Sequence, residues 1–207
     1  MYTSPSIVIG FHGCDQSTAD QIIKEGASLS SSDNDYDWLG NGIYFWEGSY
    51  LRALEWATEQ PPITKPAVIG AFIKLGHCLD LLDAKYIKKV SKTHTLLLSE
   101  THPLPQNTVH KNDISFVRAL DCKVINRLQQ LHNNDIAQTL GQPDKIKIQN
   151  HPDFYDSVRG MFPEGEMLYQ NAGFRDKNHI QLCITNPNAI MGYFDPRKQS
   201  NAFKRLI

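Results

Sequence analysis

Three short segments each place one polar side chain in an otherwise apolar, strand-like stretch. They are residues 11–13 (Phe-His-Gly), residues 40–45 (Gly-Asn-Gly-Ile-Tyr-Phe) and residues 179–184 (His-Ile-Gln-Leu-Cys-Ile). A buried polar group needs a hydrogen-bond partner, so His12, Tyr44 and Gln181 favour one shared ligand pocket over three unrelated core positions. We therefore expect a pocket whose polar groups are an imidazole, a phenol and a carboxamide.

The glycine pair at positions 40 and 42 is not a dinucleotide-binding fingerprint by itself. That fingerprint requires Gly-x-Gly-x-x-Gly at a strand-to-helix turn, whereas a strand-like Ile-Tyr-Phe run follows here and the third glycine is missing. Phosphate-loop patterns are absent from the sequence as well. A Rossmann-type cofactor site is therefore disfavoured, and this Gly-Asn-Gly taken alone indicates a tight turn.

In combination, the segments resemble the motifs of the poly(ADP-ribose) polymerase-like ADP-ribosyltransferases. Residues 11–13, followed by a helical stretch and Lys-Glu-Gly at 24–26, resemble the first motif. Residues 40–45 resemble the second motif, Gly-x-Gly-Ile-Tyr-Phe, which an alanine-bearing helix follows. Residues 68–82 look like the family's central strand, and residues 180–193 resemble its final hairpin.

The resemblance covers about residues 6–82 and 178–194, in the order in which the family carries its motifs. Residues 83–177 match no motif of the family. The pattern is also similar to compact bacterial toxin members of this superfamily, including members that modify RNA in phage defence.

The resemblance implies that the chain binds NAD and transfers its ADP-ribose group. Breaking the nicotinamide–ribose bond builds positive charge on the ribose, which an enzyme stabilises while it grips the nicotinamide. By resemblance, His12 hydrogen-bonds a hydroxyl of the adenosine ribose, the backbone of Gly13 pairs with the nicotinamide carboxamide, and Tyr44 stacks on the nicotinamide ring. The other face of that ring would meet Tyr36 or Trp56, the latter one residue away from the family's aromatic position.

Gln181 stands where the polymerases carry a glutamate. A glutamine can hydrogen-bond a hydroxyl of the nicotinamide ribose, but it cannot add negative charge beside the cation or take a proton. We therefore expect Gln181 to position the substrate, chain elongation to be absent, and a single ADP-ribose to be transferred. A general base would come from Glu164 or, as the candidate catalytic residue, Glu166, because related enzymes place an acceptor-recognition loop there.

Each candidate residue also has a structural interpretation. Alone, His12 would be a satisfied structural histidine, Tyr44 a core aromatic residue, and Gln181 a surface residue of a strand. Tyr36 could anchor its loop instead of clamping a ring, Trp56 could belong to the core, and the two loop glutamates could be solvated charges. The other histidines show no metal-ligand spacing, so no metal site is expected.

Strands and helices follow one another irregularly along the chain. Strands are expected at 6–11, 43–46, 67–75, 179–185 and 189–194, and helices at about 15–26, 49–59, 84–98 and 114–131. Residues 28–37 indicate a polar loop, and residues 150–178 an irregular polar segment.

The last two expected strands lie too close together in the sequence for a crossover helix. The strand pattern therefore predicts an α+β fold with a mainly antiparallel sheet instead of a doubly wound one. The resemblance makes this the split antiparallel sheet of an ADP-ribosyltransferase with flanking helices. We expect a single domain of residues 1–207 with a mainly helical insertion at about 83–141.

Composition and charge are those of an ordinary globular protein. The 207 residues are 41% hydrophobic and 21% charged, with a net charge of -1, so the overall charge directs the chain neither to nucleic acid nor to acidic membranes. The longest apolar run, residues 67–75, is too short for a bilayer, and the N-terminus lacks secretion-signal features. Four scattered cysteines without a Cys-x-x-Cys pair disfavour zinc or disulfides and are typical of the cytoplasm.

The expected insertion is locally basic. Within residues 85–127 the acids are Glu100, Asp113 and Asp121, and the basic side chains are Lys85, Lys88, Lys89, Lys92, Lys111, Arg118, Lys123 and Arg127. Such an excess is usually a solvated helical face, but it could lead a polyanionic acceptor toward the pocket. With the resemblance to bacterial toxins, this makes a base in RNA the leading acceptor, with a protein side chain as the alternative and an antitoxin as a further partner.

Two other functions stay open. The missing glutamate is compatible with a module that binds NAD or ADP-ribose, or only a partner protein, without catalysing transfer. The same pocket could also serve an NAD glycohydrolase that passes ADP-ribose to water.

Overall fold

The computed structural model describes residues 5–100, 103–109, 116–141 and 143–196. The strands are β1 (Ile7–Asp15), β2 (Ile43–Glu47), β3 (Pro66–Lys74), β4 (Cys78–Asp80), β5 (Asn107–Val109), β6 (Phe116–Arg118), β7 (Ser157–Phe162), β8 (His179–Ile184) and β9 (Ile190–Phe194). The helices are α1 (Gln16–Glu25), α2 (Tyr50–Glu59), α3 (Ala84–Glu100), α4 (Ala119–Thr139), α5 (Lys145–Gln149) and the 3-10 turn η1 (Pro187–Ala189).

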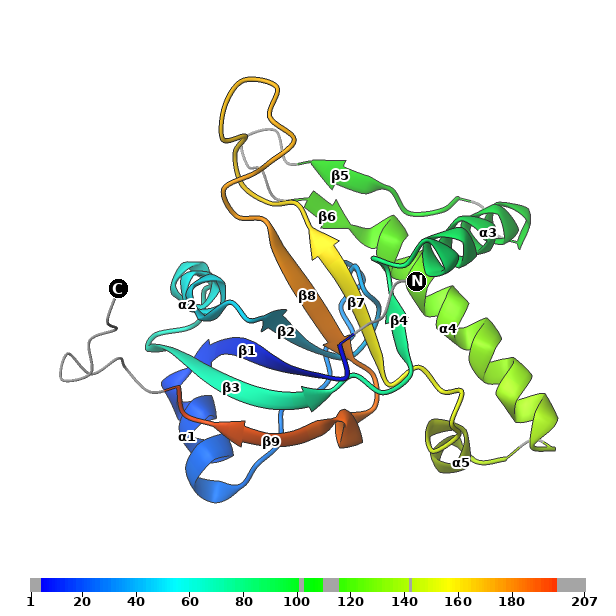
Figure 1. Ribbon diagram of the computed structural model, residues 1–207, viewed down its shortest axis with the longest axis horizontal. Helices are drawn as coiled ribbons and strands as arrows, with labels where there is room; N and C mark the ends of the chain where they lie inside the picture. Colours follow the sequence, from blue (N-terminus) through cyan, green and yellow to red (C-terminus); the bar gives the residue numbers. More distant parts are fainter. Residues whose placement is uncertain (1–4, 101–102, 110–115, 142, 197–207) are drawn as a thin grey trace.

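The described part is an α+β fold built on one seven-stranded sheet. The strand order is β4-β7-β8-β2-β1-β3-β9, and β5 and β6 form a separate hairpin (Figure 1). Neighbouring strands are antiparallel except for β4 and β7, which are parallel. The predicted α+β class with a mainly antiparallel sheet is therefore confirmed.

The sheet separates between β1 and β2. β1 pairs with β3 along its whole length, from Ile7 opposite Lys74 to Asp15 opposite Pro66. In contrast, β1 pairs with β2 only through Gly10 opposite Glu47 and Phe11 opposite Trp46. Beyond Phe11 the two strands diverge, and Figure 1 shows β1, β3 and β9 turning away from β4, β7 and β8. His12 lies at the start of this separation.

Helices α1 and α2 pack beside β1 and β3. The Asp15 carboxylate accepts a hydrogen bond from Ser17 N (3.1 Å) at the start of α1, and Gly26, with φ of 73°, ends the helix as predicted. A Cβ at Gly13 would lie 2.2 Å from the carbonyl oxygen of Ala53 in α2. The glycine at position 13 therefore lets α2 lie directly against β1.

The region predicted as a helical insertion contains α3, the β5–β6 hairpin and α4. Helices α3 and α4 contact each other, and residues of both join one apolar cluster with the end of the sheet, including Tyr86, Ile125, Tyr155 and Val158. The helix predicted at 114–131 instead begins at Ala119, after β6, and runs to Thr139. Part of that prediction, residues 114–115, lies outside the described residues.

Residues 157–162 form β7, although the sequence predicts an irregular segment there. Two residues hide the strand pattern. Arg159 is a buried charge that ion-pairs with Glu47 (2.6 Å) and Asp80 (3.2 Å), and Gly160 leaves room for a tryptophan ring. Residues 68–82, which resemble the family's central strand, do not form one strand: β3 ends at Lys74, and β4 lies at the opposite edge of the sheet, parallel to β7.

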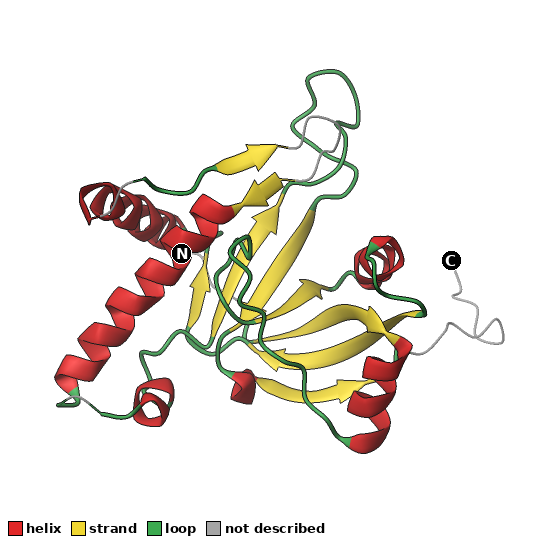
Figure 2. Cartoon of the chain, turned by 180° about the vertical axis from the view of Figure 1, so that it is seen from behind, coloured by secondary structure: helices red, strands yellow, loops and turns green. Residues whose placement is uncertain are grey.

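The loop between α1 and β2 crosses one face of the sheet, as the view from behind shows (Figure 2). Backbone hydrogen bonds between Ser32 and Gly42, of 2.8 and 3.0 Å, tie this loop to the start of β2. Residues 34–38 are thereby held over the region where β1 and β2 separate. None of the helices in the described ranges is both long and apolar enough to cross a bilayer.

Candidate active site

A cleft of about 330 Å³ lies where β1 and β2 separate. Its volume is at the small end of the range for ligand sites in proteins, roughly 300–1,000 Å³. The lining residues are His12, Ser30, Ser32, Asn34, Tyr36, Asp37, Trp38, Gly42, Tyr44, Trp46, Trp56, Arg118, Phe162 and Gln181. The cleft therefore brings together five residues predicted from the sequence: His12, Tyr36, Tyr44, Trp56 and Gln181.

The His12 imidazole spans the separation between β1 and β2. Its Nδ1 lies 2.8 Å from the backbone oxygen of Tyr44. Because a carbonyl oxygen only accepts, Nδ1 carries the proton and donates it, and Nε2 of the neutral ring remains as an acceptor. Burial lowers the pKa of His12, and the hydrogen bond to Tyr44 only partly opposes this effect. Near pH 7 the ring is therefore neutral and presents one acceptor nitrogen.

The Tyr44 hydroxyl is used inside the protein. It donates to the backbone oxygen of Gly40 (2.8 Å) and accepts from the backbone N–H of Leu39 (3.0 Å). Burial also raises the pKa of Tyr44, so the phenol stays protonated. The ring lines the cleft while the hydroxyl fixes the Gly40 turn, which suits a stacking surface better than an acid or base.

The Gln181 side chain is oriented by Trp38. The indole Nε1–H of Trp38 donates to Gln181 Oε1. An indole nitrogen can only donate, so the amide oxygen must face Trp38 and the amide NH₂ remains to donate to a ligand. Together, an acceptor on His12 and a donor on Gln181 suit hydroxyl groups, which both donate and accept.

Gly160 makes the contact between Trp38 and Gln181 sterically feasible. It lies opposite Gln181 in the β7–β8 ladder, and a Cβ there would lie 2.6 Å from Cη2 of Trp38. The absent side chain gives the indole space above β7. Trp38 was not among the residues predicted for the site, because its role depends on Gly160 and Gln181, which are distant in the sequence.

Three further aromatic rings line the cleft: Trp46 of β2, Trp56 of α2, and Tyr36 of the loop between α1 and β2. Trp46 and Trp56 have ring centroids 5.6 Å apart, and Tyr36 is 53% exposed at the opening. Trp46 is buried, and its Nε1–H has no hydrogen-bond partner among the residues that the structure describes. A buried donor of this kind costs free energy until an acceptor reaches it, and Trp46 is a lining residue of the cleft that the sequence did not indicate.

Gly13 does not line the cleft. It is buried, and the space beside it is filled by α2, so the structure gives it a packing role at the back of the site. The predicted pairing of its backbone with a nicotinamide carboxamide has no support from this geometry.

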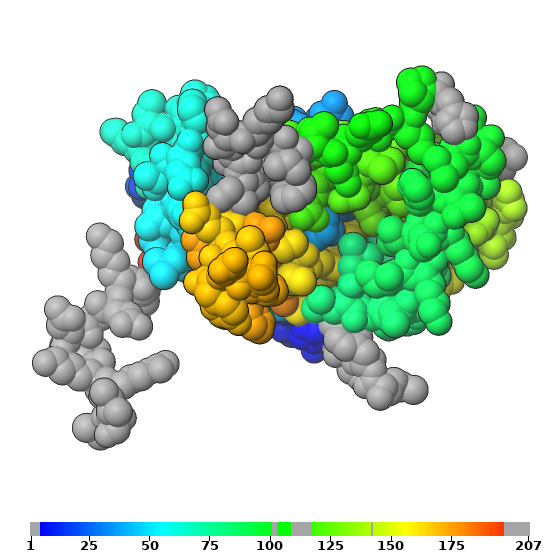
Figure 3. Space-filling view, turned by 90° about the horizontal axis from the view of Figure 1, so that it is seen from above, coloured from blue at the N-terminus to red at the C-terminus, as the bar shows by residue number. Residues whose placement is uncertain are grey.

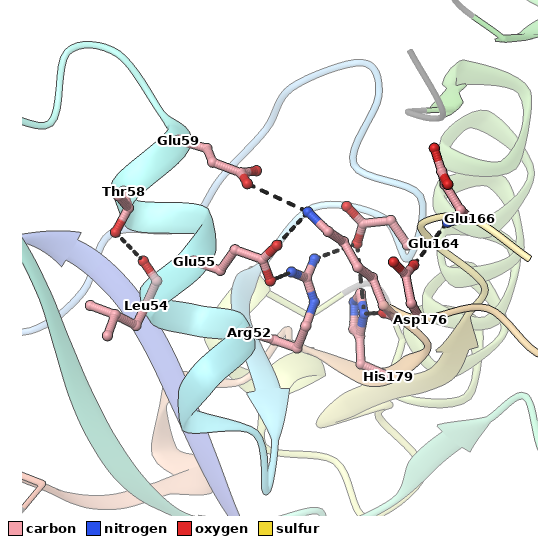
Figure 4. A network of polar contacts seen from close by, with 10 residues as sticks. Arg52, Leu54, Glu55, Thr58, Glu59, Glu164, Glu166, Asp176 and His179 are labelled. Atoms are coloured by element: carbon pink, nitrogen blue, oxygen red, sulfur yellow. Dashed lines mark hydrogen bonds and ion pairs between the residues drawn. The ribbon is translucent and has the colours of Figure 1, made fainter. Parts of the chain in front are cut away.

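Glu166 also lies away from the cleft. Its backbone N–H donates to Asp176 (2.8 Å), while its exposed carboxylate points away from the neighbouring ion pairs (Figure 4). The Glu164 carboxylate accepts from Arg52 of α2 (2.8 Å). The structure therefore does not bring Glu166, the predicted general base, to the other site residues.

A network of ion pairs holds the loop of residues 163–178 against α2 (Figure 4). Arg52 binds both Glu55 and Glu164, and Lys177 binds Glu55 and, at 3.4 Å, Glu59. Figure 3 shows this loop, in orange, between α2 and the green α3–α4 region. The loop is thus placed beside the cleft by contacts at both of its ends.

Within the described ranges, no group of three or more His, Cys, Asp or Glu side chains could hold a metal ion. A second cavity, of about 360 Å³, lies mainly between α3 and α4. It shares Trp38 with the cleft but contains none of the residues predicted for the site.

Similarity to known proteins was found for nearly the whole chain. An uncharacterized protein of Methanocaldococcus jannaschii is 25% identical over 211 residues, covering 93% of this chain and 90% of that protein. No family model matches the chain. No solved structure matches it either. Because the alignment spans nearly the full length, it includes most of the α3–α4 region as well as the sheet.

Stability is expected to depend on pH through His12 and His179. Burial lowers the pKa of both imidazoles, whereas in the unfolded chain they protonate near their ordinary pKa of about 6.5. Below that pH the unfolded state binds more protons, so the free energy of unfolding falls as the pH is lowered. Urea midpoints should be level from about pH 8 to pH 7 and should decline from about pH 6.5 toward pH 5.

A double variant, His12→Gln with His179→Gln, provides the comparison. It should flatten the decline between about pH 6.5 and pH 5, because neither side chain can then take a proton. An equally steep decline in the double variant would assign the pH dependence to other groups.

Proposed function

We propose that this chain binds NAD in the cleft and transfers a single ADP-ribose to a macromolecular acceptor. The observation that supports this most strongly is the convergence of His12, Tyr44 and Gln181, which come from three different strands, on one cleft. The proposal rests on these residues and their geometry together with the resemblance of the motifs.

The groups at the cleft fit the nicotinamide and the two riboses of NAD. The acceptor nitrogen of His12 would bind a hydroxyl of the adenosine ribose, and the amide NH₂ of Gln181 would bind a hydroxyl of the nicotinamide ribose. The Tyr44 ring would stack on the nicotinamide, with Trp56 or Tyr36 on its other face.

The proposed reaction breaks the bond between C1′ of the ribose and the nicotinamide nitrogen. The electron pair of that bond returns to the nicotinamide, which leaves as a neutral molecule, and the acceptor atom forms the new bond to C1′. The acceptor loses one proton to water. Gln181 fixes the ribose as charge develops on it, and the neutral His12 holds the far end of the ligand.

RNA is the acceptor that we propose first. In its support, α3 carries Lys85, Lys88, Lys89 and Lys92 along its first half, and Arg118 reaches the cleft itself. Two basic side chains of the α3–α4 region already have partners inside the protein: Lys89 donates to Tyr155, and Arg127 binds Glu100. Lys111 and Asp113, which also entered the charge count, lie outside the described residues.

A labelled-NAD experiment tests the acceptor. The purified protein is incubated with NAD labelled in the adenosine part and with RNA, DNA or lysate protein in separate reactions. Label in RNA supports the proposal in full. Label only in protein would contradict RNA as acceptor and leave transfer standing, whereas ADP-ribose free in solution would identify a glycohydrolase.

We further propose a role as a bacterial toxin or phage-defence effector, with an antitoxin that covers the cleft or the 163–178 loop. Expression in a bacterium should then arrest growth, and His12→Ala or Tyr44→Ala should relieve the arrest. Equal toxicity of the wild type and both variants would contradict this role.

Trp38→Phe is expected to slow nicotinamide release about threefold to tenfold. The change keeps an aromatic ring but removes the indole N–H that orients Gln181, and a neutral hydrogen bond is worth about 0.5–1.5 kcal/mol. Trp56→Phe is the matched control, because it makes the same substitution in the same cleft without touching the Gln181 contact. Equal rates for the two variants would show that Trp38 does not act through Gln181.

A further inference from the structure

Arg118 brings a positive charge from the α3–α4 region into the cleft. It is the last residue of β6 and precedes α4, and its side chain is 14% exposed. The guanidinium carbon lies 4.1 Å from the centre of the Phe162 ring and 5.1 Å from that of Trp38. The two rings therefore hold the guanidinium in a defined place at the cleft.

The N–H groups of a guanidinium lie in its plane, and its flat faces carry no donors. Contacts with the two aromatic rings hold the group at the cleft, and acidic side chains lie near enough to act on its charge. One of these is Asp121, whose Oδ2 lies 3.9 Å from Nη1 of Arg118. A planar donor fork of this kind matches the paired oxygens of a phosphate group.

The cleft also contains an acidic side chain, which has hydrogen-bond donors of its own. Asp37 is the one carboxylate among the described lining residues, and it accepts from Ser32 Oγ (2.6 Å) and the backbone N–H of Asn34 (2.9 Å). Burial raises the pKa of Asp37. Burial also lowers the pKa of Arg118, and a partly desolvated cation attracts an anion more strongly than one in water.

We propose that Arg118 is the phosphate-binding residue of the cleft. This inference rests on the proposed function, in which both substrates carry phosphate: NAD through its diphosphate and an RNA acceptor through its backbone. It gives the α3–α4 region a direct part in the site, because the fork that holds the anion comes from there and not from the motif-bearing strands.

Calorimetric titration tests the proposal with three probes: inorganic pyrophosphate, ADP-ribose and nicotinamide riboside, which has no phosphate. The proteins are the wild type, Arg118→Gln, Arg118→Lys and, as a charge-matched control, Lys123→Gln on α4. Arg118→Gln should weaken ADP-ribose and pyrophosphate about ten- to hundredfold and leave nicotinamide riboside unchanged. Arg118→Lys should fall between, because a lysine keeps the charge but not the planar fork. Lys123→Gln should match the wild type.

ADP-ribose binding and the rate of transfer to RNA, both measured with Arg118→Gln, show which substrate supplies the phosphate. Weaker ADP-ribose binding by Arg118→Gln assigns the diphosphate of NAD. Unchanged ADP-ribose binding, with weaker pyrophosphate binding and slower transfer to RNA at an unchanged rate of nicotinamide release, assigns a phosphate of the acceptor.

Two outcomes separate this proposal from the proposed function. If Arg118→Gln and Arg118→Lys match the wild type with every probe and in transfer, Arg118 is not a phosphate-binding residue, although nicotinamide release would still support NAD cleavage. If the wild type neither binds ADP-ribose nor releases nicotinamide, but binds pyrophosphate through Arg118, the proposed function fails and the phosphate site stands.

Discussion

Replacing His12 with alanine is expected to reduce nicotinamide release from NAD at least about a hundredfold, because misplacing a bound substrate by about 1 Å can cost that much. The imidazole does two things that alanine cannot. Its Nδ1–H bridges to the backbone of Tyr44 across the separation of β1 and β2, and its Nε2 is the acceptor offered to a ribose hydroxyl. The measurement is the initial rate of nicotinamide formation by purified wild type and variant.

His94→Ala is the matched control, because His94 lies on α3 and lines the second cavity instead of the cleft. It should retain the wild-type rate. Circular dichroism of both variants establishes that they are folded. A folded His12→Ala protein that releases nicotinamide as fast as the wild type would remove His12 from the site.

The second large effect is expected at Gln181, where two substitutions should act in opposite directions. Gln181→Leu removes both the bond to Trp38 and the donor to the ribose, so nicotinamide release should again fall at least about a hundredfold. Gln181→Glu keeps an oxygen for the Trp38 N–H and adds negative charge beside the developing cation. It should therefore release nicotinamide at least as fast as the wild type.

Glu166→Ala completes this set as a variant of the predicted base. Because Glu166 does not line the cleft, its removal should leave both nicotinamide release and transfer at the wild-type rate.

A wild-type rate for Gln181→Leu would show that the amide of Gln181 does not take part. Loss of activity in both Gln181 variants would show that the NH₂ donor, which glutamate lacks, is the essential group.

Most of the sheet could be predicted because its strands carry their own signal. Residues 43–47 and 179–184 are short apolar runs beside turn residues, so periodicity alone places β2 and β8. β7 could not be predicted in this way. Its Arg159 is tolerated in the core only because Glu47 and Asp80 pair with it, and both partners are distant in the sequence.

The residues of the candidate site also fall into those that the sequence could predict and those that it could not. His12, Tyr44 and Gln181 could be selected together because each interrupts an apolar run in a motif of known order. Trp38 and Arg118 could not, because neither stands in a motif and each acquires a role only through contacts with Phe162 or Gln181. Gly13 stands in a clear motif, but the structure gives it a packing contact with α2 and no place in the lining of the cleft.

The most direct measurement is chromatographic detection of nicotinamide after incubation of NAD with the purified protein, in the presence and absence of total RNA. The proposed chemistry requires nicotinamide to appear with the wild type, and to appear at background level with His12→Ala and Gln181→Leu. A folded wild-type protein that leaves NAD intact with RNA, DNA and lysate protein would contradict cleavage of NAD at this cleft.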